Sequence, residues 1–343
     1  MYNLWKLLVS ALSLIGLGTA EAWGRKNIIL DTDFFSDVDD AGALLLAATM
    51  PNSNLLGVNI NHPSSYSALA VSAILNHYGS SDIPIGLRGP ITNETYFDNY
   101  FYELGEFASK VAYHWSNNTI PWGKMDNIWH PVTLYRKLLS DQSDKSVTIA
   151  SVGFFENLSG LLNSTADEFS HLSGRELIVR KVSQVVIMGG QYPSGSEYNF
   201  FGDDPLTTGH VINTWPTQVP IVFSGGELGE NVQSGGLLTR DAPEDDPVRA
   251  AYRWYVGYNQ TRSSWDPLTV LFAVQGLGDV FEYGNTFGYN HVLTNGSNEW
   301  VFDTQRRDQK WLKLKVDNIT AAARLDQLYL RGAKFESSRA GGV

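Results

Sequence analysis

Short apolar runs alternate along this chain with longer stretches of helical pattern, and this alternation restricts the fold most. Five runs have the length and Val/Ile/Leu content of buried strands: 27–30, 56–60, 147–150, 184–188 and 221–223. Helical patterns lie between them, over 40–48, 67–78, 131–139 and 157–162. Strands that alternate with helices form βαβ units. No repeat or low-complexity linker divides the 343 residues. We therefore predict one α/β domain with a mostly parallel central sheet flanked by helices.

Two segments interrupt the alternation. Residues 93–129 are rich in Tyr, Phe and Trp and occupy the place of a strand-to-helix loop. They form either a lid or wall over a ligand site, or a helical insertion packed on the core. Residues 285–313 have the pattern of strands and turns, and a final helix is expected over 319–330.

The first residues have the pattern of a secretory signal. A weakly basic start over 1–6 precedes an apolar run over 7–18, which is too short to span a bilayer. Ala20-Glu21-Ala22 then supplies the small residues that a signal peptidase recognises. We expect a signal peptide over 1–22, a mature domain over 23–343 and secretion; a buried N-terminal helix is the alternative. No later stretch is apolar for long enough to imply a membrane partner.

Glycosylation sequons and the absence of cysteine agree with this compartment. Sequons of the N-x-S/T type, which suggest a secreted eukaryotic glycoprotein, begin at Asn93, Asn117, Asn157, Asn163, Asn259, Asn295 and Asn318. The chain has no Cys, which excludes a thiol nucleophile and cysteine zinc ligands and leaves stability to the core. A net charge of −11 repels phosphate, so a nucleic-acid partner is not expected.

The strongest local signal is a cluster of carboxylates. Five of the ten residues from 31 to 40 are aspartates, between a hydrophobic strand and an Ala/Leu-rich helix: Asp31, Asp33, Asp37, Asp39 and Asp40. Open α/β sheets bind ligands at the carboxyl ends of their parallel strands. So many carboxylates repel one another unless a hard cation such as Ca²⁺ or Mg²⁺ lies among them. A solvated acidic loop with helix caps is the alternative, and it accounts for one or two aspartates rather than five.

This segment resembles the opening motif of the inosine-uridine preferring nucleoside hydrolase family, Asp-Thr-Asp followed by Asp-Asp. Four later segments resemble family motifs in the same order: ASVGFFENL at 150–158, VVIMGG at 185–190, EYN at 197–199 with DP at 204–205, and WDPL at 265–268. The likeness covers about 27–330. It implies a Rossmann-like nucleoside hydrolase architecture and cleavage of the N-glycosidic bond of a ribonucleoside to ribose and free base.

The resemblance also implies a Ca²⁺ site that holds the attacking water. By position in the motifs, Asp33 would bind the metal and take a proton from that water. Asp40 and Asp266 would supply further carboxylate ligands, and Glu156 would supply its backbone carbonyl. The gap between Asp33 and the Asp-Asp pair is longer than in the plain bacterial motif, so Asp37 stays an alternative for the base.

Other matched positions imply how the nucleoside is held. Asp39, Glu197 and Asn199 would bind ribose, and Met188 would line its pocket. The family has a Gly-Asn pair after its second strand, and Asn61 would take that role here.

Some family members place a His directly before the late Asp, where this chain has Trp265. An indole cannot act as a general acid at neutral pH, but it can stack on a purine ring. We therefore expect a purine preference; a plain core role for Trp265 is the alternative. A second aromatic wall is expected from Trp115, Trp122 or Trp129.

Two other functions compete with hydrolysis of a small nucleoside. A magnesium phosphatase would use Asp31 and Asp33 as an Asp-x-Asp motif, but the later motifs then have no explanation. A secreted, non-catalytic nucleoside- or sugar-binding protein on the same scaffold is the third possibility. The chain has neither a P-loop nor a G-x-S-x-G elbow. Self-association into a homo-oligomer is left open by the sequence.

Overall fold

The computed structural model describes residues 24–99, 105–116, 120–121, 125 and 128–340. The signal peptide expected over 1–22 lies outside these residues. Among the described residues, no helix has both the length and the apolar character needed to cross a membrane.

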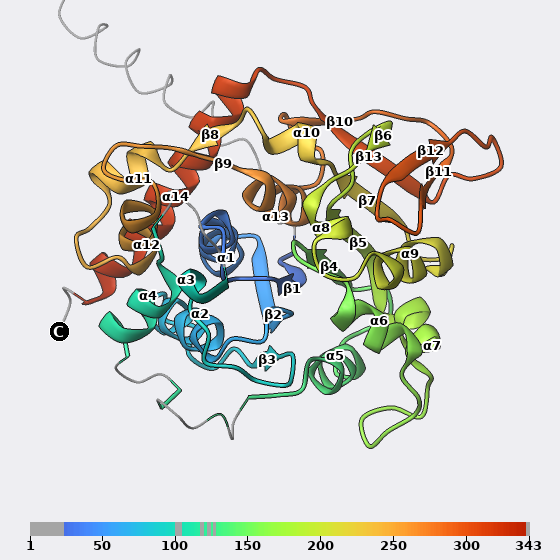
Figure 1. Ribbon diagram of the computed structural model, residues 1–343, viewed down its shortest axis with the longest axis horizontal. Helices are drawn as coiled ribbons and strands as arrows, with labels where there is room; N and C mark the ends of the chain where they lie inside the picture. The colour runs from blue at the N-terminus through green and yellow to red at the C-terminus, as the bar shows by residue number, and fades with distance from the viewer. Residues whose placement is uncertain (1–23, 100–104, 117–119, 122–124, 126–127, 341–343) are drawn as a thin grey trace, which may run out of the picture.

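A sheet of eight strands runs through the centre of the molecule (Figure 1). Its order is β10-β13-β7-β5-β4-β1-β2-β3, and all neighbours are parallel except β10, which is antiparallel to β13. The strands are β1 (Lys26–Thr32), β2 (Ser53–Ile60), β3 (Ile85–Leu87), β4 (Val147–Ser151), β5 (Val182–Met188), β7 (Ile221–Ser224), β10 (Phe281–Tyr283) and β13 (Gln309–Leu314).

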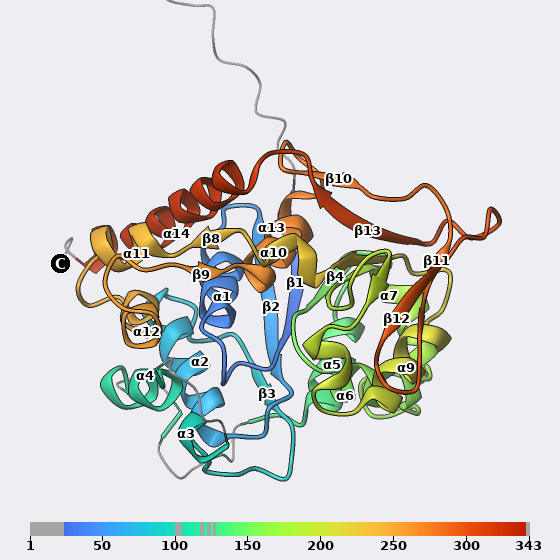
Figure 2. The same cartoon turned by 45° about the horizontal axis from the view of Figure 1, so that its top comes forward.

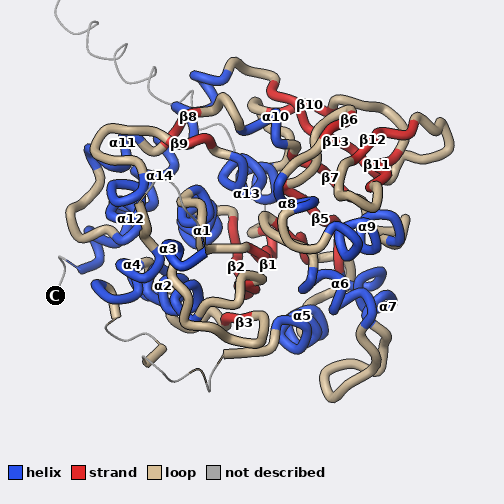
Figure 3. The backbone as a smooth tube through the Cα atoms, in the orientation of Figure 1, coloured by secondary structure: helices blue, strands red, loops and turns tan. Residues whose placement is uncertain are grey.

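Helices cover both faces of this sheet, as Figure 3 shows by the band of strands between two groups of helices. One face carries α1 (Asp39–Thr49), α2 (Ser65–His77), α4 (Ala108–His114), α10 (Gly226–Gly229), α11 (Gly236–Asp241), α12 (Pro247–Tyr255), α13 (Trp265–Gln275) and α14 (Asn318–Ala340). The other carries α5 (Pro131–Ser140), α6 (Glu156–Asn163), α7 (Gly174–Lys181), α8 (Tyr198–Phe201) and α9 (Pro205–Thr214). The predicted α/β architecture is confirmed.

Successive side chains of each strand point to opposite faces of the sheet, so each strand contributes to the hydrophobic core on both faces. In β1, Ile28 and Leu30 belong to the core under α1 and α13, whereas Ile29 belongs to the core under α5 and α6. Strands buried on both faces read as continuous apolar runs. This is why the five central strands were recognisable from sequence.

The remaining elements lie around the sheet (Figure 2). They are the helix α3 (Tyr96–Asn99) and the short strands β6 (Ser194–Gly195), β8 (Gln233–Ser234), β9 (Arg262–Ser263), β11 (Tyr289–Val292) and β12 (Asn298–Val301). β11, β12 and β6 form a small antiparallel sheet, as the pattern at 285–313 suggested. β13 of the same segment instead joins the main sheet beside β7.

The aromatic segment 93–129 combines both proposed roles in its described part. α4 packs against α2, and Val111 and Ala112 are buried there, as in a helical insertion. Tyr96 on α3 lines the main cavity, as a wall residue would.

Candidate active site

A cavity of about 490 Å³ opens at the carboxyl ends of the central strands. It is reached by Asp33 after β1, Val152 after β4, Met188 at the end of β5 and Gly226 after β7. This is where open α/β sheets bind ligands. Nine residues singled out from sequence line the cavity: Asp33, Asp37, Asp39, Asp40, Met188, Glu197, Asn199, Trp265 and Asp266.

Three aspartates meet on the floor of this cavity. Asp39 and Asp40 form the first turn of α1, and Asp266 lies in the first turn of α13. One carboxylate oxygen from each lies within 4.8 Å of the other two, and all three residues are buried. α1 packs against α13, so the N-termini of two helices bring together carboxylates that are 226 residues apart in sequence (266 less 40).

The electrostatics of this group fit a bound cation. Burial, and after it the neighbouring carboxylates, raise the pKa of Asp39, Asp40 and Asp266 well above the usual range. A divalent cation held by oxygen ligands removes both penalties, because it solvates the charges and cancels their repulsion. This donor set of buried carboxylates can hold a metal ion.

Asp33 stands beside this group rather than within it. Its charge acts on Asp40 and Asp266, and burial raises its own pKa to about 7, with smaller contributions from Asp37 and Glu197. Its loop packs against Gly153, where a Cβ atom would come within 2.4 Å of the Asp33 backbone nitrogen. Glycine at 153 therefore allows the two strand-end loops to touch. A carboxylate with a pKa near neutrality is suited to accept a proton.

Asp37 has a different partner. Nε of Arg262, on β9, donates to Oδ1 of Asp37 at 2.9 Å, and Nη2 donates to Oδ2. The gap between Asp33 and Asp39 is longer here than in the plain bacterial motif, and Asp37 lies in it. Its two-bond ion pair joins this part of the β1–α1 loop to the cavity wall that contains Arg262. Since Asp37 neutralises an arginine, it is less available as a base than Asp33.

Glu197 and Asn199 are fixed at the next strand end. Glu197 caps α8 and accepts backbone bonds from Gly190 at 3.1 Å and Asn199 at 3.0 Å, while burial raises its pKa to about 7. The Asn199 amide nitrogen donates to the carbonyls of Val152 at 3.2 Å and Met188 at 3.3 Å. These contacts set the orientation of two polar side chains that line the cavity.

Aromatic rings and Arg262 form another wall. Trp265 donates from Nε1 to the carbonyl of Gly226 at 2.8 Å, and the Arg262 guanidinium lies 5.2 Å from its ring centroid. Tyr255 lies 5.7 Å from the same guanidinium, and Tyr96 is 6.5 Å from Tyr255 between ring centroids. The aromatic wall thus comes from Tyr96, Tyr255 and Trp265.

The tryptophans proposed from sequence as a second wall lie elsewhere. Trp115 donates to the carbonyl of Asp245, and Trp129 packs against Phe169. Trp122 lies outside the described residues. Tyr96 was missed within its aromatic segment, and no pattern in the sequence singled out Tyr255.

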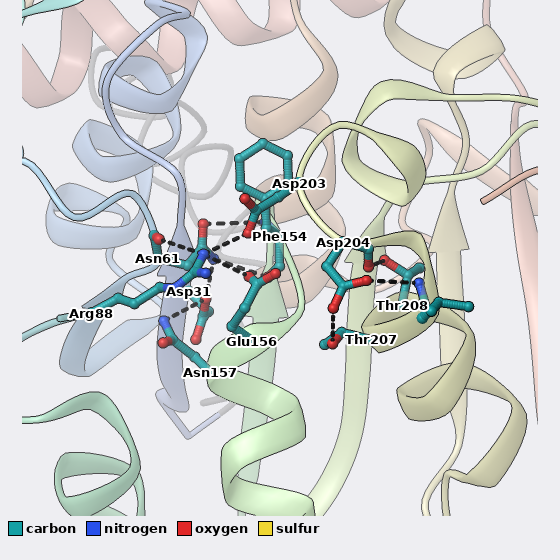
Figure 4. A network of polar contacts seen from close by, with 11 residues as sticks. Asp31, Asn61, Arg88, Phe154, Glu156, Asn157, Asp203, Asp204, Thr207 and Thr208 are labelled. Atoms are coloured by element: carbon teal, nitrogen blue, oxygen red, sulfur yellow. Dashed lines mark hydrogen bonds and ion pairs between the residues drawn. The ribbon is translucent and has the colours of Figure 1, made fainter. Parts of the chain in front are cut away.

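Asp31 and Asn61 do not line the cavity, but their hydrogen bonds hold together the strand ends beside it. The buried Asp31 carboxylate accepts bonds from Asn61 at 2.7 Å and Asn157 at 3.3 Å (Figure 4). It also accepts a bond from Tyr135 at 2.7 Å. Asn61 also donates to the carbonyl of Phe154 and accepts from its N–H. Both amide protons and the side-chain oxygen of Asn61 are therefore engaged within the protein. Asn61 thus ties three strand ends together and does not line the cavity, and its role in substrate binding stays a prediction.

Glu156 begins α6 outside the cavity lining. Its side chain lies 3.3 Å from Arg88, which also pairs with Asp203 at 2.5 Å (Figure 4). Burial, followed by its contact with Asp203, raises the pKa of Glu156 to about 8. The side chain belongs to this ion-pair group, so a ligand role for Glu156 falls to its backbone carbonyl alone.

A model of the family described as inosine-uridine preferring nucleoside hydrolase matches residues 28–326. The chain belongs to this family. No curated protein sequence matches the chain.

Solved nucleoside hydrolases share its fold. A plant nucleoside hydrolase has a TM-score of 0.64 at 17% identity, covering 90% of this chain and 99% of its own. An inosine-guanosine nucleoside hydrolase has a TM-score of 0.64 at 18% identity, with the same coverage. A purine-preferring ribonucleoside hydrolase from Gardnerella vaginalis has a TM-score of 0.62 at 15% identity, covering 92% of this chain and 100% of its own.

Family membership and geometry together weigh against the phosphatase alternative. That mechanism needs Asp31 as a nucleophile or a metal ligand. In this nucleoside hydrolase chain, Asp31 is fully buried, accepts three side-chain bonds and does not line the cavity. Its role is structural.

Proposed function

We propose that this chain hydrolyses the N-glycosidic bond of ribonucleosides, with a preference for purines and with Ca²⁺ as the metal. The observation that carries the proposal is the group of Asp39, Asp40 and Asp266 on the floor of a nucleoside-sized cavity, with Asp33 beside it. We assign the metal to Asp33, Asp40 and Asp266, as expected from the motifs, with the Glu156 carbonyl as a further ligand. Asp39, which the motifs imply as a ribose-binding residue, is added to the metal ligands because its carboxylate lies in the same group.

The side chains then divide the chemistry between them. Departure of the base leaves an oxocarbenium-like ribosyl cation, which a cluster of carboxylates favours electrostatically. Asp33 accepts the proton of the attacking water, because its carboxylate lines the cavity beside the three metal-binding aspartates, where that water would be held. Glu197 and Asn199 hold the ribose hydroxyls, and Met188 gives the sugar an apolar contact. When bound, Ca²⁺ supplies charge neutralisation and lowers the pKa of water.

The preference for purines rests on the aromatic wall. Trp265 is fixed by its bond to Gly226 and presents its ring at the cavity, where a purine offers more surface than a pyrimidine. Two of the similar structures are named as inosine-guanosine and purine-preferring enzymes, which agrees with this assignment.

The test is a direct assay. Purified protein with Ca²⁺ is incubated with inosine, and ribose and hypoxanthine are quantified. We expect turnover, its loss in Asp40→Ala, and no loss in Asp144→Ala, whose carboxylate is an exposed partner of Lys181. Binding without release of base would favour a non-catalytic nucleoside-binding protein. Release of phosphate from a phosphoester, with inosine untouched, would favour the phosphatase.

We also propose that the protein is secreted and N-glycosylated. Support comes from the signal-like residues 1–22 and from the exposed asparagines of five sequons: Asn93, Asn163, Asn259, Asn295 and Asn318. Asn157 is buried and donates to Asp31, so a glycan there is incompatible with the fold. Expression in a eukaryotic secretory host should give protein in the medium with glycans on exposed sequons and none on Asn157. Retention inside the cell would contradict the proposal.

A further inference from the structure

We infer that Arg262 selects the base, and that the preferred substrates are 6-oxopurine nucleosides, such as inosine and guanosine, rather than adenosine. The inference rests on the proposed hydrolysis and adds a recognition residue to it. If the floor carboxylates, Glu197 and Asn199 take the ribose, the wall left for the base contains Trp265, Tyr255 and Arg262.

Arg262 has hydrogen-bond donors to spare. A guanidinium carries five N–H donors and no acceptor. The bonds from Nε and Nη2 to Asp37 use two of them along one edge of the group. In the described part of the chain, no acceptor is recorded for Nη1. One proton on Nη2 and those on Nη1 therefore form a second pair of donors.

The surroundings hold this donor pair in place. The guanidinium lies 5.2 Å from the ring centroid of Trp265 and 5.7 Å from that of Tyr255, while Asp37 fixes its rotation through two bonds. The Trp265 ring is held in turn by its bond to Gly226. A planar group restrained in this way loses little entropy when it binds a second partner.

The donor pair matches one kind of base edge. Guanine and hypoxanthine present O6 and N7, two neighbouring acceptors that an arginine binds with two parallel bonds. Adenine presents N7 beside an N6 amine. The N–H groups of this amine would face the N–H groups of Arg262, so no hydrogen bond can form between them. Uracil offers a single O4 acceptor on the matching edge. Donation to O6 and N7 also stabilises the negative charge that builds on the departing base, so it should raise kcat.

The experiment compares bases and arginine variants in the Ca²⁺-loaded protein. Wild-type kcat/KM should be at least about tenfold higher on inosine and guanosine than on adenosine. Arg262→Met should lower kcat/KM on inosine by about tenfold to a hundredfold and change that on adenosine by less than about threefold. Arg262→Lys keeps the positive charge but loses the paired N–H donors of the guanidinium. Its kcat/KM on inosine should therefore lie between those of the wild type and Arg262→Met.

A matched control is available on the surface. Arg240 makes the same two-bond pair, with Asp241, at 2.8 and 2.7 Å on α11, away from the cavity. Arg240→Met should leave both the activity and the inosine-to-adenosine ratio unchanged.

The outcomes separate this inference from the proposed function. No hydrolysis of any ribonucleoside would reject the function itself. Hydrolysis with adenosine as good as inosine would reject the role of Arg262, and would point to Glu227 or Glu230, which also line the cavity and can accept from an N6 amine. Equal losses on both substrates in Arg262→Met would also reject it. If Arg262→Met does not fold, inhibition of the wild-type enzyme by the free bases tests the same inference. Hypoxanthine should inhibit at a lower concentration than adenine, and the reverse order would reject the inference.

Discussion

The backbone N–H of Trp265 donates to Oδ2 of Asp39 at 3.0 Å, and this bond joins the start of α13 to the start of α1. The N–H of Asp266 donates to the same oxygen at 3.1 Å. Two free N–H groups at a helix N-terminus are thereby satisfied by a carboxylate from another helix. The arrangement holds Asp266 against Asp39 and Asp40, so one contact builds both the helix packing and the carboxylate floor.

Asp39→Asn should separate these two roles. The amide oxygen still accepts from the Trp265 and Asp266 N–H groups, while one charge leaves the crowded floor. We expect the chelated variant to melt at or above the temperature of the chelated wild type. Its stabilisation by Ca²⁺ should shrink from the gain of about 2.7 kcal/mol expected at a concentration of 100 Kd. Differential scanning fluorimetry with and without Ca²⁺ measures both. An unchanged Ca²⁺ response would remove Asp39 from the metal site.

Asp33 and Asp37 should differ sharply as asparagine variants. Asp33→Asn removes the proposed base, so kcat should fall by about two to four powers of ten with substrate binding retained. Asp37→Asn loses the ion pair with Arg262 and leaves the base in place, so kcat on inosine should fall far less. Steady-state kinetics on inosine compares the two. A dead Asp37→Asn beside an active Asp33→Asn would reverse the assignment.

Trp265→Ala should affect the leaving base. Loss of stacking is worth about 1–3 kcal/mol, or roughly one to two powers of ten in kcat/KM on inosine. The loss should be much smaller on p-nitrophenyl riboside, whose leaving group needs no protonation. Trp265→Phe keeps a ring without the bond to Gly226 and serves as the matched variant. Equal losses on both substrates would mean that Trp265 only shapes the pocket.

Asn61→Ala should reduce stability rather than substrate affinity. The substitution removes the Asn61 partner of both the Phe154 N–H and the Phe154 carbonyl, and it leaves Oδ1 of Asp31 with Asn157 as its donor. Each buried backbone group that loses its partner costs about 1–3 kcal/mol. Urea unfolding should show a lower midpoint, while KM for inosine in the folded protein stays close to that of the wild type. A large rise in KM with unchanged stability would restore Asn61 as a substrate-binding residue.

The stability of the metal-free protein should fall as pH rises, and Ca²⁺ should offset that loss. Burial raises the pKa of Asp33 and Glu197 to about 7 and also raises the pKa values of the floor aspartates, whereas unfolded carboxyls titrate at about 4. The folded, metal-free protein therefore binds more protons than the unfolded chain between these values. Its free energy of unfolding must fall as pH rises from about 4 through about 7.

Melting temperatures from pH 5 to pH 8 check this sign. The chelated protein should lose stability toward pH 8, and the rise produced by Ca²⁺ should be larger at pH 8 than at pH 5, because the ion binds the ionised carboxylates. A chelated protein that gains stability over the same range would contradict the placement of these carboxylates in a buried cluster.

The amino-acid sequence alone determined the central strands and much of the site. β1, β2, β4, β5 and β7 are buried on both faces, so each appears as a continuous apolar run. Asp33, Asp39 and Asp40 come soon after β1 in the sequence. Residues that follow a parallel strand lie at the carboxyl end of the sheet, where such sheets bind ligands. Signals of this kind are local, since neighbours in sequence carry them. The edge strand β10 and its neighbour β13 are less uniformly apolar, and gave no comparable signal.

Only the tertiary structure decided which distant groups meet. Arg262 is 225 residues from Asp37, and nothing near either residue in the sequence indicates the other. The packing of α1 against α13 brings Asp266 to Asp39 and Asp40, and it also turns Arg262 and Trp265 into the same cavity. The meeting of three strand ends, likewise, engages every polar atom of the Asn61 side chain within the protein. A polar group that is buried away from water needs a hydrogen-bond partner. The packing of helices and strand ends decides which distant residue supplies that partner, so the local sequence does not indicate it.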